Sequence, residues 1–144
     1  MAILSVLLVD DKPGDVRLVV EAFKESRVQN NLSIVGDGEE AISFLKQEGK
    51  YQNAPRPNLV LLDLRLPGLN GLEVLKQIKG NEKISGIPVI VLSNSDSEAD
   101  INSAYKYMAN CYIVKPFAMA EFIEVVKYME KFWMNCVRLP GQKL

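Results

Sequence analysis

Five polar residues follow short apolar runs of the kind that form buried strands, and their types suggest one shared chemistry. They are Asp10 and Asp11, Asp63, Ser93 and Lys115. If the runs are parallel strands, their carboxyl ends share one edge of a sheet and the five side chains converge there. Packed carboxylates repel one another unless a cation lies among them, and an oxygen-bound Mg²⁺ would supply that charge. One carboxylate could then attack phosphorus, while the ion, the ammonium and the hydroxyl bind the three equatorial oxygens of the transferred group.

Each of these residues alone has a simpler interpretation. Paired aspartates before a turn usually cap a helix or remain in solvent, and an aspartate after a strand usually forms a turn. A single serine or lysine at a strand end indicates nothing by itself. Only their joint occurrence at the ends of four predicted strands favours a shared site.

The order of the predicted elements supports this convergence. Short runs rich in Val, Ile and Leu predict strands at residues 6–9, 32–35, 59–62, 89–92 and 111–114. Apolar residues at helical spacing predict helices at residues 15–25, 39–47, 72–79, 97–108 and 118–133. Regular βα alternation is typical of an α/β fold with a doubly wound parallel sheet, and five strands favour the flavodoxin-like order 2-1-3-4-5. The polar residues 48–57 are expected to form a surface loop.

Composition limits the possible classes of protein. The 144 residues, 48% of them hydrophobic, predict one domain over residues 1–144, with a core at about 4–133 and a tail at about 135–144. The formal charge of −1 and the lack of a basic run argue against nucleic-acid binding. No run approaches the roughly 20 apolar residues of a membrane span, and the apolar start lacks the positive charge of a signal peptide. Cys111 and Cys136 are expected to be free thiols in a reducing cytoplasm.

The chain contains no histidine, which removes the commonest general base and the commonest metal ligand. Any metal must therefore be bound by oxygen, which favours Mg²⁺ or Ca²⁺.

Four spaced motifs resemble a known family. They are "VDD" at residues 9–11, "LLDLRLPGLNGLEVL" around Asp63, "VIVLSNS" ending near Ser93 and "YIVKPF" around Lys115. Together they resemble the CheY-like receiver domain of response regulators in two-component signalling, over about residues 4–133. The stretch "DKPGDVRLVVEAFKE" and the loop before residue 59 resemble the small single-domain regulators that pair with bacterial and cyanobacterial phytochromes.

The resemblance implies a phosphoacceptor and a metal site. Asp63 would accept the phosphoryl group. Asp11 and Asp63 would bind Mg²⁺ directly, Asp10 would bind it through water, and the backbone carbonyl of Arg65 would be a further ligand.

The resemblance also implies a switch. Lys115 would contact the phosphoryl group, and Ser93 and Tyr112 occupy the two switch positions. The bond between Lys115 and Pro116 is commonly cis in this family. Asn94 departs from the small residues that the family often has there, and it could narrow access to Asp63.

The implied function is that of a signalling protein, with catalysis limited to its own Mg²⁺-dependent phosphorylation and dephosphorylation. The donor would be a phosphohistidine on a sensor histidine kinase, for which a phytochrome is one candidate. Phosphorylation would then alter the surface formed by residues 97–133.

Two other interpretations remain. A haloacid-dehalogenase-like phosphohydrolase would need a second aspartate two residues after its nucleophile, where this chain has Arg65, and a cap domain. A degenerate receiver that only binds partners would not need the complete site.

The last predicted helix carries more apolar residues than one buried stripe requires. One set can face the sheet: Met119, Phe122, Ile123, Val126, Met129 and Trp133. A second set, Val125, Tyr128 and Phe132, lies about 80–100° around the helix, and the preceding helix adds Tyr105, Tyr107 and Met108. A broad groove or the tail at residues 135–144 could cover these side chains. We expect instead a two-fold homodimer through this face, with Phe132 near its centre.

Overall fold

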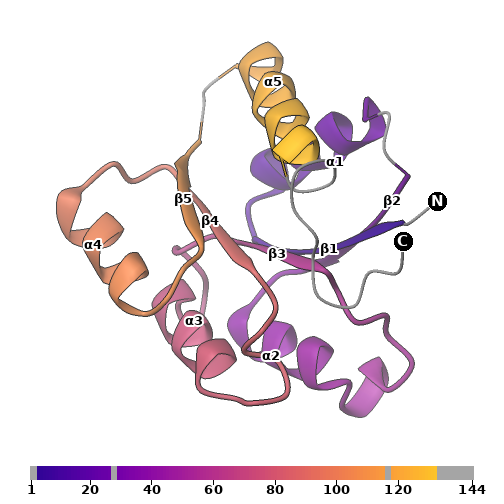
Figure 1. Cartoon of the computed structure of the whole chain (residues 1–144), viewed down its shortest axis with the longest axis vertical. Helices are drawn as coiled ribbons and strands as arrows, with labels where there is room; N and C mark the ends of the chain where they lie inside the picture. Colours follow the sequence, from indigo (N-terminus) through magenta and orange to yellow (C-terminus); the bar gives the residue numbers. More distant parts are fainter. Residues whose placement is uncertain (1–2, 27–28, 116–117, 133–144) are drawn as a thin grey trace.

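The computed structural model describes residues 3–26, 29–115 and 118–132, and its centre is a parallel sheet (Figure 1). The five strands have the order β2-β1-β3-β4-β5. They are β1 (Leu4–Val9), β2 (Asn30–Val35), β3 (Leu59–Leu62), β4 (Val89–Ser93) and β5 (Cys111–Val114). This order confirms the predicted flavodoxin-like fold.

Among the described residues, five α-helices connect or follow the strands, as the apolar spacing predicted. They are α1 (Pro13–Lys24), α2 (Gly38–Lys46), α3 (Gly71–Lys79), α4 (Glu98–Lys106) and α5 (Met119–Glu130). Side chains of Asp37, Asn70 and Ser97 accept a backbone N–H in the first turns of α2, α3 and α4, which satisfies donors that the helix itself leaves unpaired. The polar loop before β3 contains a short 3₁₀ helix, η1 (Gly49–Tyr51).

The helices cover both faces of the sheet. Figure 1 shows α1 and α5 together on one face, and α2, α3 and α4 on the other. Alternate residues of β1 and β3 belong to two separate hydrophobic clusters, one beneath each helix layer. Central parallel strands are buried on both faces, which explains why β3 is a continuous apolar run.

Some predicted features lie outside the described residues: the isomer of the bond to Pro116, the position of Trp133, the thiol of Cys136 and the tail at residues 135–144. In the described part of the chain, no helix has the length and hydrophobicity needed to cross a membrane.

The apolar surface of α5 divides differently from the sequence prediction. Phe122, Val126 and Met129 are buried against the sheet, as expected. Met119 was expected to face the sheet but is 40% exposed, because it begins the first turn of the helix. Val125 was assigned to the outer set but packs against the same buried cluster.

A buried carboxyl lies at the end of α5. Glu130 is buried, and its Oε1 has no hydrogen-bond partner among the described residues. Burial raises the pKa of Glu130 above its ordinary value of 4.5, although a hydrogen bond with Ser26 opposes the change. The folded state therefore holds this proton more tightly than the unfolded state does. The corresponding stabilisation is complete below pH 4.5 and is lost as the pH rises through the folded-state pKa.

We expect Glu130→Gln to raise the melting temperature at neutral and alkaline pH by a few degrees. The glutamine side chain has a similar shape to glutamate but carries no charge to be buried. The gain should shrink as the pH falls toward 4.5, where the wild-type carboxyl is protonated. Thermal unfolding across this pH range measures the effect, with the exposed Glu124→Gln as control. A gain in melting temperature that does not depend on pH would show that ionisation of Glu130 is not its cause.

Candidate functional site

The carboxyl ends of the central strands bring together the acidic residues expected from the sequence. Asp10 follows β1 and Asp63 follows β3, and both residues are 2% exposed. Asp11 is exposed beside them. One carboxylate oxygen from each of the three lies within 4.8 Å of the others.

Sheet register sets this arrangement. The pairing of Val9 with Leu62 continues for one residue, because the Asp63 N–H donates to the Val9 carbonyl at 3.0 Å. Gly71 then allows α3 to begin against this turn. A Cβ at Gly71 would lie 2.4 Å from the Asp63 carbonyl oxygen and 2.5 Å from Cα of Leu64, which is too close for any other residue.

Lys115 reaches the acidic residues from the end of β5. Its Nζ lies 2.9 Å from Asp10 Oδ2, 2.9 Å from Asp15 Oδ2 and 3.7 Å from Asp63 Oδ2. Burial alone lowers the pKa of Lys115, but the hydrogen bonds with Asp15 and Asp10 outweigh it and raise the pKa above its ordinary value. Lys115 is therefore a fixed positive charge.

A second lysine, which the sequence analysis did not single out, contacts the same cluster. Lys12 Nζ donates to Asp63 Oδ2 and, at 2.7 Å, to the backbone carbonyl of Arg65. Asp11 Oδ1 lies 3.3 Å from the same nitrogen. Burial lowers the pKa of Lys12, but the ion pairs with Asp63 and its neighbours raise it by more.

Asp15 was also missed, although it lies in the first turn of α1 and pairs with Lys115. Both omissions concern the turn that leaves β1. A charged residue within about one helical turn of a strand's carboxyl end can reach the sheet edge, and this proximity was the available signal.

The charges of the cluster do not balance. Four aspartates, Asp10, Asp11, Asp15 and Asp63, surround two ammonium groups. Burial raises the pKa of Asp10, while hydrogen bonds from the Lys12 backbone and from Lys115 oppose that change. If all six groups are ionised, two positive charges are lacking, which is the charge of one divalent ion.

The donor set fits a hard divalent cation. Carboxylate and carbonyl oxygens are the ligands that Mg²⁺ and Mn²⁺ prefer, and such oxygens converge here from Asp10, Asp11, Asp63 and Arg65. The Lys12 ammonium already lies within hydrogen-bond distance of three of these residues, so the geometry accommodates a positive centre.

The expected switch residues lie on the β4 side of the site. Ser93 is fully buried, and its Oγ accepts the N–H of Ser95 rather than contacting an aspartate. The hydroxyl of Tyr112 donates to the Ser95 carbonyl at 2.8 Å. Ser95 therefore contacts both residues. Asn94, the atypical residue beside Ser93, is exposed.

Ser95 is also connected to the acidic side of the site, through Asp100 and Arg65. The Ser95 hydroxyl donates to Asp100 Oδ2 at 2.6 Å, and the Arg65 guanidinium lies 3.5 Å from the same oxygen. Arg65 thus presents its backbone carbonyl to the carboxylate cluster and its side chain to α4.

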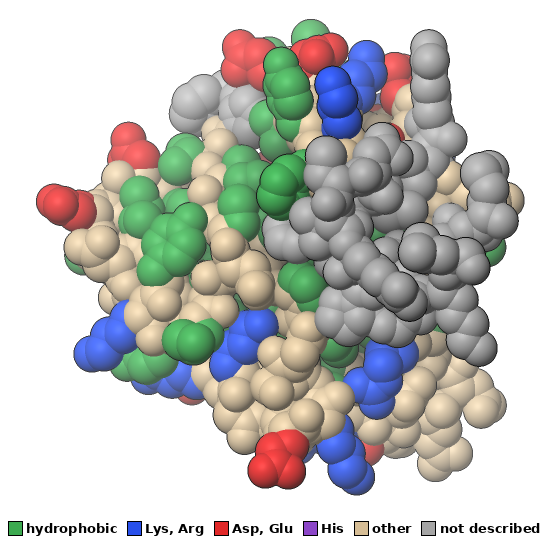
Figure 2. All heavy atoms as spheres, viewed as in Figure 1, with side chains coloured by type: hydrophobic (Ala, Val, Ile, Leu, Met, Phe, Trp, Pro, Cys, Tyr) green, Lys and Arg blue, Asp and Glu red, His purple; other side chains and the backbone are tan. Residues whose placement is uncertain are grey.

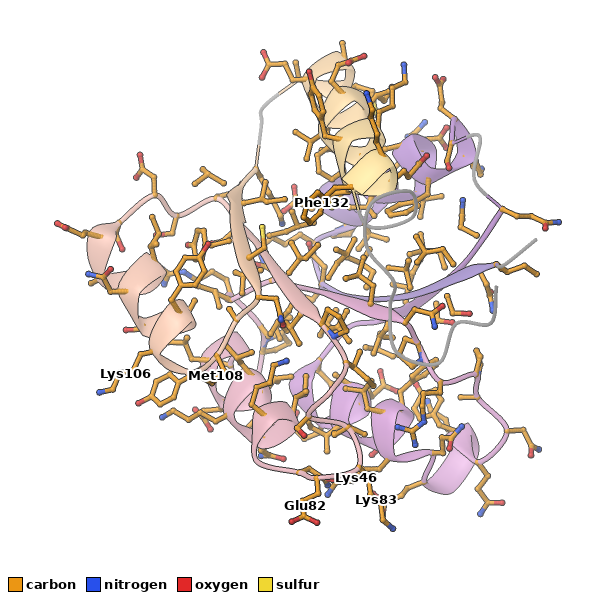
Figure 3. The ribbon with its side chains drawn as sticks, viewed as in Figure 1. Lys46, Glu82, Lys83, Lys106, Met108 and Phe132 are labelled. Atoms are coloured by element: carbon orange, nitrogen blue, oxygen red, sulfur yellow. The ribbon has the colours of Figure 1, made fainter. Side chains whose placement is uncertain are left out.

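Two hollows differ in their relation to this chemistry. One of about 470 Å³ opens beside Asp11, Lys12 and Arg65, so a donor can approach the carboxylate cluster from solvent. A larger hollow of about 560 Å³ lies at the opposite edge of the sheet, where Figure 3 shows Lys46, Glu82 and Lys83. Its labelled side chains are exposed, and the one group of three acidic side chains that could bind a metal among the described residues lies at Asp10, Asp11 and Asp63 instead.

Comparison with known proteins identifies the family. The model of the response regulator receiver domain matches residues 6–127. The chain belongs to this family. Response regulator Rcp1 from Synechocystis sp. (strain ATCC 27184 / PCC 6803 / Kazusa) is 44% identical over 136 residues, which cover 94% of this chain and 92% of Rcp1.

Solved structures agree with this receiver fold. The phosphorylated cyanobacterial phytochrome response regulator RcpA has a TM-score of 0.91 at 43% identity, covering 96% of this chain and 99% of RcpA. The Mn²⁺-bound form of Rcp1 has a TM-score of 0.88 at 43% identity, covering 96% of this chain and 99% of Rcp1. The protein is thus a receiver domain of two-component signalling. Membership of this family implies phosphorylation on an aspartate, and the acidic cluster fits a divalent metal.

We expect Lys115→Met to destabilise this receiver domain by about 3 kcal/mol or more, because it removes the nearer of the two ammonium groups beside Asp10, which stays buried next to Asp63. Urea unfolding in metal-free buffer measures the loss. Lys127→Met, which removes an exposed ion pair with Glu124, is the matched control and should change stability by under about 1 kcal/mol. Equal effects of the two substitutions would show that the buried pair has no special role.

Proposed function

We propose that this protein is a phosphorylation-controlled switch in which Asp63 accepts the phosphoryl group. The observation that carries the proposal is the convergence of buried Asp63 with Asp10, Asp11 and the Lys115 ammonium at one sheet edge. A carboxylate oxygen of Asp63 would form a bond to phosphorus as the bond from phosphorus to the donor nitrogen breaks. Lys115 would then neutralise part of the charge on the phosphoryl oxygens.

We assign the metal as Mg²⁺. Asp11, Asp63 and the backbone carbonyl of Arg65 would bind it directly, with Asp10 binding through water. When bound, this ion neutralises charge on the phosphoryl oxygens and so favours both phosphorylation and later hydrolysis. The deficit of two positive charges in the cluster supports a divalent ion, and the short metal–oxygen distances of Mg²⁺ suit converging carboxylates.

The proposed donor is a phosphohistidine on a sensor histidine kinase. The chain has no histidine of its own, so a histidine donor must come from another protein. RcpA is described as a phytochrome response regulator, and its similarity over 96% of this chain supports a phytochrome as the kinase. We place the reaction in the cytoplasm. Beyond this chemistry on its own aspartate, we propose no enzymatic activity.

The proposed switch acts through Ser93 and Tyr112. A phosphoryl oxygen on Asp63 would accept a hydrogen bond from the Ser93 hydroxyl, and rotation of the side chain toward it would draw Oγ away from the Ser95 N–H. Because Tyr112 donates to the Ser95 carbonyl, movement of that loop would change the position of the Tyr112 ring. The surface formed by α4, β5 and α5 would then change, as a two-state element responding to a local change of charge.

Asp63→Asn is expected to abolish phosphorylation while the fold survives, because it keeps the size of the side chain and removes the nucleophile. Labelling with acetyl phosphate and Mg²⁺, followed by mass spectrometry of the peptide around residue 63, measures this. Asp96→Asn, at an exposed position in the same sheet-edge region, is the control and should be labelled as the wild type is. Full labelling of Asp63→Asn, at a residue that mass spectrometry also finds labelled in the wild-type protein, would overturn the acceptor assignment, whereas rerouting to a residue that the wild type leaves unlabelled would not.

We further propose that the protein forms a two-fold homodimer through α4, β5 and α5. Figure 2 shows hydrophobic side chains gathered over these elements. The large exposed ones are Tyr105 (49%), Met108 (66%), Val114 (40%), Met119 (40%), Tyr128 (70%) and Phe132 (53%). Figure 3 shows Phe132 at the end of α5, with Met108 just beyond α4. Several large apolar side chains exposed on one face often mark an interface.

Phe132→Glu is expected to convert the dimer to a monomer, because it places a charge near the centre of an apolar interface. Sedimentation at micromolar concentration measures the state of association. Ile34→Glu is the matched control, since Ile34 is 45% exposed on β2 at the opposite edge of the sheet. A wild-type protein that is monomeric, both with and without a phosphoryl analogue, would contradict the dimer.

A further inference from the structure

Lys12 is not the lysine expected to contact the phosphoryl group, yet its ammonium lies inside the acidic cluster. Its ammonium lies among oxygens of three residues, Asp63, Arg65 and Asp11. These are the same three that are proposed above as direct ligands of Mg²⁺. A fourth oxygen, Asp10 Oδ1, lies 3.9 Å from the same nitrogen.

The two lysines of the site have different surroundings. Lys115 Nζ bonds to Asp10 and Asp15 and lies 3.7 Å from Asp63, and its side chain is 4% exposed. Lys115 can therefore remain in place when a metal binds. Lys12 Nζ instead bonds to the Arg65 carbonyl. Because two positive charges repel each other at such short distances, a metal ion and this ammonium cannot bind the same oxygens at once.

The backbone holds Lys12 at this position while leaving its side chain free to move. Lys12 is the N-cap of α1, in an extended conformation, and Pro13 follows it in the first turn. Its N–H donates to Asp10 Oδ1 at 3.0 Å, which fixes the start of the side chain at the edge of the cluster. The side chain is 37% exposed and ends beside the open hollow that Asp11 and Arg65 also line. A four-carbon stem can carry the ammonium into this solvent without any change in the backbone.

We propose that Lys12 is a tethered cation that competes with the divalent ion for the oxygens of Asp11, Asp63 and Arg65. This inference rests on the proposed metal site. Without metal, Lys12 offsets the repulsion among the carboxylates and holds them together. Metal binding displaces the ammonium toward the hollow, and the loss of its contacts lowers the apparent affinity for the ion. Lys12 thereby sets the concentration of Mg²⁺ at which the site becomes competent.

Substitution of Lys12 tests the competition through binding. Calorimetric titration of metal-free protein with Mg²⁺ should show a dissociation constant about tenfold lower for Lys12→Met than for wild type, the size expected when a competing charged hydrogen bond is removed. Lys12→Gln should show the same gain, which guards against an effect of the methionine itself. Lys24→Met removes one positive charge from an exposed position at the far end of α1 and should change the constant little.

A second measurement uses the wild-type protein and does not depend on any variant folding. Lysine acetylation followed by mass spectrometry should show that saturating Mg²⁺ increases modification of Lys12, because its ammonium is released into solvent. Lys50, an exposed lysine paired with Glu40 away from the cluster, should not respond. Asp11→Ala should weaken Mg²⁺ binding and remove the response of Lys12 at the same concentration.

The outcomes separate this inference from the proposed metal site. If Asp11→Ala weakens Mg²⁺ binding but Lys12→Met and Lys12→Gln bind it as wild type does, the competition is wrong and the metal site stands. Unchanged acetylation of Lys12 in saturating Mg²⁺ would also overturn it. If neither the wild type nor the Lys12 variants bind Mg²⁺, the metal site and the competition both fail.

Discussion

Repulsion among carboxylates at one edge of the sheet is the constraint on which the rest of this structure depends. Asp10 and Asp63 are buried side by side because β1 and β3 are hydrogen-bonded neighbours, and Asp11 lies beside them. Such charges are tolerated only where cations are close. The fold supplies two from different directions, Lys115 from the end of β5 and Lys12 from the turn after β1.

The same constraint underlies the proposed link between the site and the surface formed by α4, β5 and α5. In the proposed switch, phosphorylation of Asp63 would change the charge of a cluster that already lacks two positive charges, so neighbouring polar groups would rearrange. Ser95 lies at the point where this rearrangement can spread, since it bonds to Ser93, Tyr112 and Asp100. The two hydrophobic clusters hold the strands in place on either side of the sheet that carries this polar edge.

Much of the fold and part of the site could be predicted from the sequence, for identifiable physical reasons. Among the described residues, apolar periodicity located each strand and α-helix but not the short 3₁₀ helix η1. The shared edge of parallel strands predicted that Asp10, Asp11, Asp63 and Lys115 would meet. Proximity to the end of β1 indicated that Lys12 and Asp15 could reach the site, but their partners there could not be predicted, because these depend on how one turn directs the side chains. Likewise, helical spacing placed Phe122 inside but could not show that Met119, at the exposed first turn, would lie outside.

Crystallographic localisation of Mn²⁺ is the most direct test of the central claim, that this acidic cluster is a metal-dependent phosphoacceptor site. Anomalous scattering from a crystal soaked in Mn²⁺ should show one strong peak among Asp11, Asp63 and the Arg65 carbonyl, with the Lys12 ammonium displaced toward solvent. A strong peak at other acidic residues, with the cluster unchanged and Lys12 still bonded to Arg65, would contradict the account.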